Sequence, residues 1–426
     1  MFLDQTYTLH RLRRNLGLSK ADLEKIQRER LVSLIRHAYE NVPYYRRLFD
    51  TAGLKPGDIK TVKDLEHVPI TDKVVMRKLP LEDKVAHNID LKDCLNIFTS
   101  GSTGMPAHLY FTHRDFKVLD MVYLRSFLEN GLKFNYKRAF VMDPHGFETK
   151  SRWYHHLGLA RYVNISCFLE PDDQINILRE VRPDFIHGYP SSLKLIAEQI
   201  IESGENGLRP KLVSTAAELL DRKGRGQIEN AFGVKVYDRY AASEARNIAW
   251  ECDEHNGYHI NIDTLVVEFI KDGRGAVEGE RGDIVVTNLY SYAMPFIRYR
   301  IGDVGIPSDR KCPCGIELPL MEIMEGRDED FIILKGGRVV SPMVVTGTLD
   351  HVHGIKQFRV IQEDIDTVSA VFARGEGFNS DTIFKAEKAL KGILGDDIKI
   401  RCEAVEDIPR EASGKVRAVI SKVKGV

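Results

Sequence analysis

A short run of glycine and hydroxyl residues between two apolar stretches constrains the fold of this chain more than any other segment. The run consists of Thr99, Ser100, Gly101, Ser102, Thr103 and Gly104. Apolar residues 95–98 precede it and the alternating residues 108–111 follow it, which predicts a strand, a tight turn and a second strand. Because small residues let the backbone bend around an anion and hydroxyl groups add donors, the turn is typical of a phosphate-binding loop. A solvent-exposed hairpin turn of the same composition is the alternative.

The elements around this run exclude the two best-known phosphate loops. The GxxxxGK[ST] loop and the dinucleotide GxGxxG loop both lead into a helix, and neither spacing occurs in the chain. A phosphate loop that leads into a strand therefore indicates a different class of nucleotide site.

Length, charge and cysteine content restrict the class of protein. A chain of 426 residues predicts two or three domains. The net charge of -1 predicts no nucleic-acid partner. No apolar run approaches the roughly 20 residues of a membrane span, and residues 1–18 lack the apolar core of a secretory signal, so no membrane partner is expected. Six cysteines in a chain of this length do not indicate a disulfide framework, and we expect a cytoplasmic location.

The hydrophobic pattern predicts an α/β fold. Between residues 137 and 240, buried-strand patterns such as 139–142 alternate with helical stretches such as 173–181, which favours a mostly parallel sheet. Residues 258–300 change to strands joined by glycine-rich turns. We therefore expect layered sheets with helices, α+β elements and a small antiparallel or barrel-like part.

A charged and then glycine-rich stretch at 326–342 is the best candidate for an interdomain connection. The segments after it are a strand pair, a helix and a strand, at 357–373, 380–393 and 398–405. We therefore expect a large domain at 1–326 and a small C-terminal α+β domain at 327–426.

Two segments downstream of the hydroxyl run carry carboxylates that could meet a nucleotide. In 238–244 a strand leads into a turn with Tyr240 and Glu244, and an aromatic ring can cover a purine while a carboxylate can hold Mg²⁺ against phosphate oxygens. In 298–303, Asp303 follows a glycine and could accept hydrogen bonds from both ribose hydroxyls. Taken singly, each segment is more often a helix cap or a turn.

Two further segments carry basic residues. Arg327 stands beside three acidic residues in 326–331, which fits either a nucleotide contact or a solvated linker. Lys415 lies in the glycine-containing loop 409–415 and is a long-armed cation suited to a developing phosphate charge, although a lone lysine is usually a surface residue.

The joint order of these segments resembles the adenylate-forming superfamily of acyl-CoA synthetases, nonribosomal adenylation domains and luciferases. The chain is most similar to the phenylacetate-CoA ligase branch, which includes coenzyme F390 synthetase-like and capsular-biosynthesis-like members. The resemblance covers nearly the whole chain and rests on 34–45, 99–104, 188–193, 216–218, 240–244, 294–303 and 413–415. It implies a two-step reaction: a carboxylic acid and ATP form an acyl-adenylate and pyrophosphate, and the thiol of coenzyme A then displaces AMP.

The resemblance also implies roles for individual residues. The nucleotide would be held by the 99–104 loop together with Ala217, Glu218, Arg239, Tyr240, Asp303 and Arg327. Glu244 would bind Mg²⁺, and Lys415 would stabilise charge on the α-phosphate and the attacking carboxylate. Glu329 falls where the family often has a hinge Asp, so the small domain is expected to swing about residues 327–331.

Three departures from the family pattern bear on activity. Met105 stands where many relatives carry Lys, which removes one cation from the phosphate loop, while Ile301 replaces the common Thr and Ala241 the common Gly. Because Glu244 and Lys415 are intact, an active enzyme is favoured. The alternatives are an adenylyltransferase that passes the adenylate to an acceptor other than coenzyme A, and a non-catalytic nucleotide-binding relative.

A group of cysteines and histidines could hold a structural metal ion. Cys312 and Cys314 form a Cys-x-Cys turn, Cys252 lies upstream, and His255 and His259 follow it. Three thiolates and one imidazole would make a closed tetrahedral Zn²⁺ site, whereas buried free thiols with surface histidines are the alternative. Some members of the resembled branch carry a matching set in which the histidine corresponds to His259, so His255 is the second choice.

The residues that line the acid pocket are the hardest to predict from the sequence. Its candidate residues are Tyr136, His145, Gly146, His187 and Tyr189. Both histidines could equally be core residues with satisfied partners, and an aromatic-lined pocket would favour an aryl or arylacetic acid. The expected ligands are thus a small-molecule carboxylic acid, ATP, Mg²⁺ and coenzyme A, and a homodimer stays open.

Overall fold

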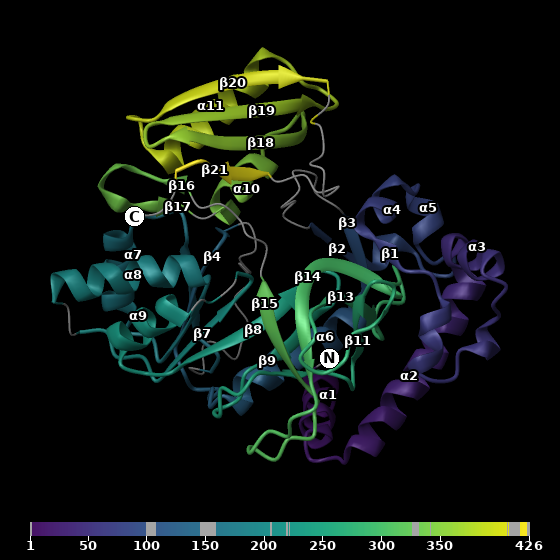
Figure 1. The fold of residues 1–426 in the computed structure, drawn as a ribbon. Helices are drawn as coiled ribbons and strands as arrows, with labels where there is room; N and C mark the ends of the chain where they lie inside the picture. The colour runs from purple at the N-terminus through teal and green to yellow at the C-terminus, as the bar shows by residue number, and fades with distance from the viewer. Residues whose placement is uncertain are drawn as a thin grey trace.

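The computed structural model describes residues 2–98, 108–144, 159–204, 207–218, 220, 222–325, 332–340, 342–406, 408 and 418–423. These residues form two parts of unequal size (Figure 1). We call the described residues up to 325 the large lobe and those from 332 to 423 the small lobe. None of the described helices is long and apolar enough to cross a membrane.

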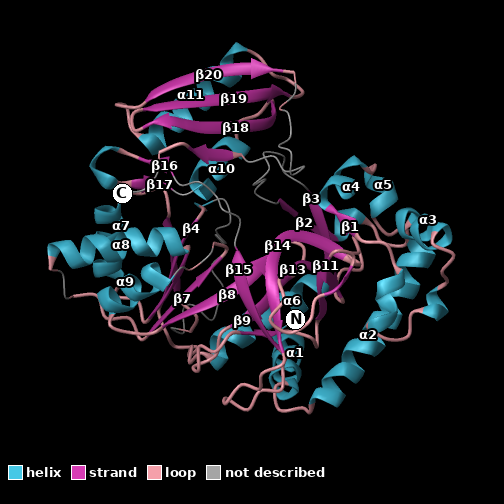
Figure 2. Cartoon of the chain, viewed as in Figure 1, coloured by secondary structure: helices cyan, strands magenta, loops and turns pink. Residues whose placement is uncertain are grey.

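A 13-stranded sheet runs through the large lobe in the order β12-β11-β13-β14-β15-β10-β9-β8-β7-β6-β4-β5, with β1 paired to β14. Its parallel strands are β4 (Arg138–Met142), β5 (Tyr162–Ser166), β6 (Phe185–Gly188), β7 (Leu212–Ala216) and β8 (Val236–Ala242). The helices that alternate with them are α7 (Pro171–Val181), α8 (Pro190–Ser203) and α9 (Arg222–Phe232), which Figure 2 shows beside these strands. Leu178, Ile196 and Ile228 of these helices belong to one buried core with Val141 and Val213 of the strands. The predicted α/β alternation is confirmed.

The other half of the sheet is antiparallel. Its strands are β9 (Arg246–Trp250), β10 (Tyr258–Ile260), β11 (Leu265–Lys271), β12 (Arg274–Gly275), β13 (Gly282–Asn288), β14 (Tyr299–Ser308) and β15 (Leu320–Glu325), and β1 (Thr71–Asp72) pairs in parallel with β14. The predicted change after residue 258 to strands joined by turns is thus confirmed. The expected antiparallel or barrel-like part is an antiparallel continuation of the parallel sheet. Among the described residues its strand order ends at β12 without closing on itself.

The N-terminal part of the large lobe is mainly helical. Its helices are α1 (Phe2–Asn15), α2 (Lys20–Asn41), α3 (Pro43–Thr51), α4 (Lys73–Lys78), α5 (Leu81–Lys84) and α6 (His113–Glu129), with short 3₁₀ helices at Pro56–Asp58, Lys63–His67 and Leu91–Asp93. Helix α2 begins after Ser19, whose hydroxyl accepts the N–H of Asp22 as an N-cap. Arg125 of α6 donates to Asp263 at 2.7 Å and to the carbonyl of Leu12 at 2.9 Å, so one buried guanidinium joins α1, α6 and the turn between β10 and β11.

The hydroxyl run is flanked by the two strands that the pattern predicts. These are β2 (Cys94–Phe98) and β3 (His108–Thr112), which pair antiparallel with Cys94 opposite Thr112 and Phe98 opposite His108. Phe111 of β3 is fully buried and lies in the main core of the large lobe. The hairpin strands are confirmed, whereas residues 99–107 between them lie outside the described residues.

The small lobe has its own sheet and its own core. A four-stranded sheet in the order β20-β19-β18-β21 is formed by β18 (Ile355–Asp364), β19 (Thr367–Arg374), β20 (Lys399–Val405) and β21 (Val419–Ser421). The remaining elements are β16 (Ile332–Ile333), a 3₁₀ turn at Lys335–Gly337, β17 (Val339–Val340), α10 (Pro342–Asp350) and α11 (Ser380–Leu394). Phe358, Phe372, Ala386 and Leu390 are buried within this lobe. The separate core fits the expected division near residue 327, but the boundary itself falls outside the described residues and stays a prediction.

Candidate active site

Three parallel strands bring residues predicted to bind the ligands to one edge of the sheet, the edge formed by the carboxyl ends of the strands. The register pairs Gly188 of β6 with Thr215 of β7, and Ala216 of β7 with Arg239 of β8. The residues at the adjoining strand ends are Tyr189, Ala217, Glu218 and Tyr240. Because ligands of open α/β sheets bind outside the carboxyl ends of the strands, this edge is the candidate active site.

The turn after β7 is strained. Ala217 has a φ of +78°, in the left-handed region that costs a non-glycine residue about 1–2 kcal/mol. Backbone strain of this kind clusters at ligand sites, where the surrounding structure holds it. The backbone around Ala217 and Glu218 is therefore set by its tertiary surroundings, which is compatible with their expected contact with adenine.

Tyr240 and Asp303 meet although they lie far apart in the sequence. The Tyr240 hydroxyl, near the end of β8, donates to Oδ2 of Asp303 on β14 at 2.8 Å. One carboxylate oxygen of Asp303 is thus held in place by a side chain of the parallel half of the sheet. This pair joins two of the residues that the family resemblance assigns to the nucleotide.

Glu244 is buried and held from two sides. The Tyr299 hydroxyl donates to Oε1 of Glu244 at 3.0 Å, and the Asn288 amide donates to the Glu244 carbonyl at 2.8 Å. Burial and the neighbouring Glu244 carboxylate raise the pKa of Tyr299 well above its ordinary value, so its hydroxyl stays a neutral donor. The second carboxylate oxygen of Glu244 has the chemistry of a hard-cation ligand such as one for Mg²⁺.

Tyr299 is a site residue to which sequence reasoning assigned no role. It stands four residues before Asp303 on β14, and side chains at even spacing on a strand share one face. That alternation was the available signal. It would have placed Tyr299 on the face that carries Asp303.

Several predicted site residues lie outside the described residues. They are Thr99, Ser100, Gly101, Ser102, Thr103, Gly104, His145, Gly146, Arg327, Glu329 and Lys415. Their roles therefore stay predictions.

Arg239 lies in the protein core beneath the strand edge. Its side chain donates to Ser126 at 2.9 Å and to Asn130 at 2.9 Å, it also contacts Ser214, and its guanidinium lies 3.7 Å from the centre of the Phe127 ring. Burial lowers the pKa of Arg239 to about 10. The described contacts therefore give this side chain a structural role, and they do not support its predicted contact with the nucleotide.

His187 also lies beneath the site. Its Nε2 is 3.1 Å from the Tyr123 hydroxyl and its Nδ1 is 3.3 Å from the Ser214 hydroxyl, so both ring nitrogens have partners. Burial, together with the positive charge of Arg239, lowers the pKa of His187 to about 3 and keeps the ring neutral. Of the two interpretations that the sequence left open, the geometry favours the core histidine.

Tyr136 and Tyr189, both predicted for the acid pocket, lie at opposite ends of the parallel strands. Tyr189 follows β6 at its carboxyl end, and its hydroxyl accepts the N–H of Asp143 at 3.4 Å. Tyr136 precedes β4 at its amino end, beneath the ammonium of Lys211. The structure therefore does not bring Tyr136 to the same edge as Tyr189, because a parallel strand of five residues separates the two ends.

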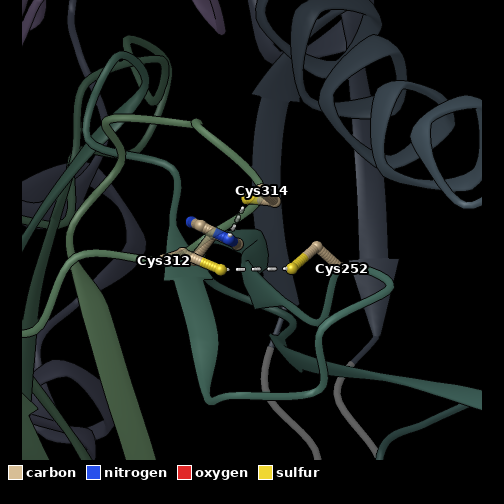
Figure 3. Close-up of side chains that lie close together, drawn as sticks. Cys252, Cys312 and Cys314 are labelled. Carbon is tan, nitrogen blue, oxygen red and sulfur yellow. Dashed lines mark hydrogen bonds between the residues drawn. The ribbon is translucent and has the colours of Figure 1, made fainter.

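Cys252, His259, Cys312 and Cys314 converge on one point in the antiparallel half. Their ligand atoms all lie within 4.8 Å of one another, with Cys252 Sγ 3.5 Å from Cys312 Sγ and Cys314 Sγ 3.3 Å from His259 Nε2 (Figure 3). His259 is fully buried, and its Nδ1 lies 3.2 Å from the Leu318 carbonyl, which leaves Nε2 directed at the sulfur atoms. Three sulfurs and one imidazole nitrogen are the donor set of a closed tetrahedral Zn²⁺ site.

His255 is not part of this cluster. Its Nδ1 lies 3.4 Å from Glu251 and 3.4 Å from Arg225, and its ring lies against that of Tyr237. The geometry therefore favours His259 over His255 as the candidate fourth ligand.

The comparisons with known proteins point to one group of relatives. The model of the CapK C-terminal domain matches residues 332–422, which is the small lobe. A phenylacetate-coenzyme A ligase of Thermus thermophilus is 27% identical over 95% of this chain and 97% of its own length. The phenylacetate-coenzyme A ligase of Escherichia coli is 30% identical over 75% of this chain and 74% of its own length. The chain belongs to the phenylacetate-coenzyme A ligase family. Protein CapK of Staphylococcus aureus is 25% identical over the whole chain and 95% of its own length.

Solved structures of a less similar ligase share the fold of this chain. The 2-hydroxyisobutyryl-CoA ligase in complex with 2-HIB-AMP and CoA, in its thioesterification state, matches with a TM-score of 0.66 and 22% identity over 96% of this chain and 91% of its own. Its open conformation with the same ligands matches with a TM-score of 0.64, 21% identity and coverage of 96% and 93%. The predicted family and fold class are therefore both confirmed.

Proposed function

We propose that this member of the phenylacetate-coenzyme A ligase family activates a carboxylic acid with ATP and transfers the acyl group to coenzyme A. In the first step a carboxylate oxygen attacks the α-phosphorus, and the bond to pyrophosphate breaks. In the second step the thiol attacks the acyl carbon and AMP leaves. The observation that carries the proposal is the convergence of Tyr240, Glu244 and Asp303 at the carboxyl edge of the parallel strands.

The described residues would divide the work of binding between them. The Asp303 carboxylate, oriented by Tyr240, would accept hydrogen bonds from the ribose hydroxyls. Glu244, oriented by Tyr299, would hold Mg²⁺, which supplies positive charge against the phosphate oxygens. The strained turn at Ala217 and Glu218 would frame the adenine.

The remaining assignments extend this proposal to residues beyond the described ranges. We assign the triphosphate to the 99–104 loop, a nucleotide contact to Arg327 and a hinge to Glu329. Lys415 would stabilise the charge that builds on the α-phosphate as the carboxylate attacks. A small domain at 327–426 that moves about this hinge would present Lys415 for the first step and a different face for the second.

We also propose that Cys252, His259, Cys312 and Cys314 hold a structural Zn²⁺ ion. The donor set fits, since the site is buried and the His259 Nδ1 already lies against a backbone carbonyl, as is usual for a histidine ligand. The ion would fasten β10 and the end of β9 to the connection between β14 and β15. It would stabilise the fold and take no part in the reaction.

The acid is a small carboxylic acid of undetermined identity, and Tyr189 is the described residue best placed to line its pocket. A panel of aromatic, arylacetic and aliphatic acids, each with ATP, Mg²⁺ and coenzyme A, tests the proposal by release of pyrophosphate and loss of free thiol. Acid-dependent release with thiol consumption is expected. Release without thiol consumption would favour an adenylyltransferase, and ATP binding without any release would favour a non-catalytic relative.

Location and assembly remain predictions of the sequence. We expect a cytoplasmic protein without nucleic-acid or membrane partners, and a homodimer as the assembly to be tested. Sedimentation of the purified protein across a concentration series distinguishes monomer from dimer.

A further inference from the structure

The segment that leads into α4 is fastened to the start of β14. The Arg298 guanidinium donates to the Val68 carbonyl at 2.6 Å. The N–H of Thr71 on β1 donates to the Arg298 carbonyl at 2.9 Å, and β1 pairs in parallel with β14, with Thr71 opposite Tyr299. Since α4 begins directly after β1, this attachment places α4 against β14, beside the tyrosine that holds Glu244 (Figure 1).

Arg77 brings a positive charge from α4 to this region. It lies in the last turn of the helix and is half-buried. Burial and the Glu244 carboxylate raise the pKa of Tyr299, and the charge of Arg77 acts against them. Asp72, the N-cap of α4, is the second charged residue of this segment that acts on Tyr299, and its charge has the opposite effect. A guanidinium therefore lies near the pair of residues to which we assign Mg²⁺.

The strand that follows the hydroxyl run packs into the same region. The ring centre of Phe111 on β3 lies 6.4 Å from that of Phe296, which in turn lies 5.3 Å from that of Tyr299. All three residues belong to the main core of the large lobe, which also buries Met76 of α4. β3, α4 and the start of β14 therefore meet in one core, and Arg77 directly follows the residue that α4 contributes to it.

The sequence of the predicted phosphate loop supplies no positive charge for a triphosphate. Residues 99–107 contain neither lysine nor arginine, and Met105 stands where many relatives carry Lys. Because Mg²⁺ neutralises only part of the charge of a triphosphate, nucleotide sites commonly add a basic side chain against the outer phosphates. The structure offers such a side chain near Glu244, and it comes from a different element.

We propose that Arg77 binds the outer phosphates of ATP, in place of the basic residue that the loop sequence lacks. The proposal rests on the proposed function, in which Glu244 holds Mg²⁺ against the same phosphates. The planar guanidinium would donate two hydrogen bonds to the phosphate oxygens, and it would balance the charge of pyrophosphate as that group leaves. Since AMP lacks the outer phosphates, Arg77 should distinguish ATP from AMP.

Equilibrium binding of ATP and of AMP tests this contact without turnover, because no acid is added. For Arg77→Gln we expect the Kd of ATP to rise about tenfold or more and the Kd of AMP to change by less than about twofold. The matched control is Lys78→Gln, which removes an exposed cation from the next position of the same helix and should change neither Kd. Equal effects of Arg77→Gln on the two nucleotides, or no effect on either, would overturn the proposal.

Titrations with and without Mg²⁺ separate a direct contact from an effect transmitted through Glu244. A guanidinium that touches the phosphates should still favour ATP over AMP in EDTA, and Arg77→Gln should still weaken ATP binding about tenfold there. A loss that occurs only with Mg²⁺ would show that Arg77 merely orients Tyr299 and Glu244, and it would overturn the contact. Arg77→Lys keeps the charge and should recover most of the affinity for ATP.

Chemical labelling of the wild-type protein decides the question even if Arg77→Gln does not fold. Phenylglyoxal, a dicarbonyl that modifies guanidinium groups, should label Arg77 several-fold more slowly with saturating ATP than with saturating AMP, as measured by mass spectrometry of the peptide. Equal labelling would overturn the proposal. If the wild-type protein binds neither nucleotide, the proposed function and the role of Arg77 fail together. If Arg77 protects as expected but no acid gives pyrophosphate release, only the proposed activity fails.

Discussion

Individual hydroxyl groups orient the carboxylates of the candidate site. Tyr240 holds Asp303 and Tyr299 holds Glu244, each through one hydrogen bond from a neutral phenol to a carboxylate. Hydrogen bonds to charged groups contribute about 1.5–3 kcal/mol. Removal of one hydroxyl should therefore loosen one carboxylate without disturbing the sheet around it.

Tyr299→Phe tests the orientation of Glu244. Because the ring is kept and only the donor is lost, we expect an approximately tenfold higher Mg²⁺ concentration for half-maximal pyrophosphate release, with little change in thermal stability. The control is Tyr292→Phe, which removes a phenol of the same lobe whose backbone carbonyl, rather than its hydroxyl, contacts His37. An unchanged Mg²⁺ dependence of Tyr299→Phe would contradict the assignment of Glu244.

The burial of His187 leads to a prediction for the pH dependence of folding stability. The unfolded chain binds a proton at this residue below a pKa near 6.5, whereas burial lowers the pKa in the folded protein to about 3. The unfolded state therefore binds more protons between these values, and the contribution of His187 to stability falls by about 1.4 kcal/mol per pH unit as the pH drops from 6.5 toward 3. Urea unfolding at pH 7 and pH 5 should show a smaller loss for His187→Gln than for the wild type.

Comparing His187→Gln with the wild type separates the effect of His187 on stability from that of Asp238, whose titration acts in the opposite direction. Burial and Glu251 raise the pKa of Asp238 to about 6, so protonation of this carboxyl as the pH falls favours the folded state. The exposed His67 offers a matched control, and His67→Gln should follow the wild type at both pH values. A pH dependence of His187→Gln identical to that of the wild type would show that the buried ring does not contribute.

Among the elements, the connection between β14 and β15 joins the candidate metal ligands to the candidate nucleotide site. β14 carries Asp303, and β15 pairs with both β14 and β10. Cys312 and Cys314 lie in the loop between these two strands, and His259 lies on β10 itself. An ion bound there would hold the ends of three neighbouring strands together.

Cys312→Ser should abolish Zn²⁺ binding and lower the unfolding temperature, because a tetrahedral site with one hard oxygen in place of a thiolate binds Zn²⁺ less tightly. Metal analysis after a chelator wash should give about one Zn²⁺ per wild-type chain and close to none for the variant. Cys94→Ser, outside the cluster, serves as the control and should keep the ion. A metal-free wild-type protein after the same wash would rule out the site.

For the molecule as a whole, the division into two lobes with separate cores is the property that bears most on function. Independent cores allow one lobe to move as a unit while both stay folded. Among the described residues, the partly exposed ion pair between Arg338 and Glu170 joins the lobes, and a small cavity lies beside it.

Lys415→Ala is expected to separate the two reactions. Loss of the cation should slow acid-dependent pyrophosphate release by about a hundredfold or more, since developing charge on the α-phosphate would be left without it. Thioester formation from a supplied acyl-adenylate should be largely spared. The matched variant is Lys422→Ala, which removes a lysine of the same lobe that pairs with Glu363. Unchanged ATP turnover in Lys415→Ala would show that this lysine is not catalytic.

Local elements and motif order could be predicted from the residues, because hydrophobic periodicity and turn composition act over a few positions. The strands around the hydroxyl run and the α/β alternation follow from such patterns. The adenylate-forming family could also be predicted, since its motifs keep their order along the chain whatever their distances in space. The identity of the acid could not, because a pocket wall is assembled from side chains of several strand ends.

The sequence by itself determined which residue types are present, the order in which they occur and the period with which apolar side chains recur. Only the tertiary structure decided that Arg239 and His187 point into the core, that Tyr136 lies at the far end of β4, and that His259 rather than His255 joins the three cysteines. The physical reason is that a side chain's partners depend on strand register and packing between residues tens to hundreds of positions apart, which no local pattern encodes.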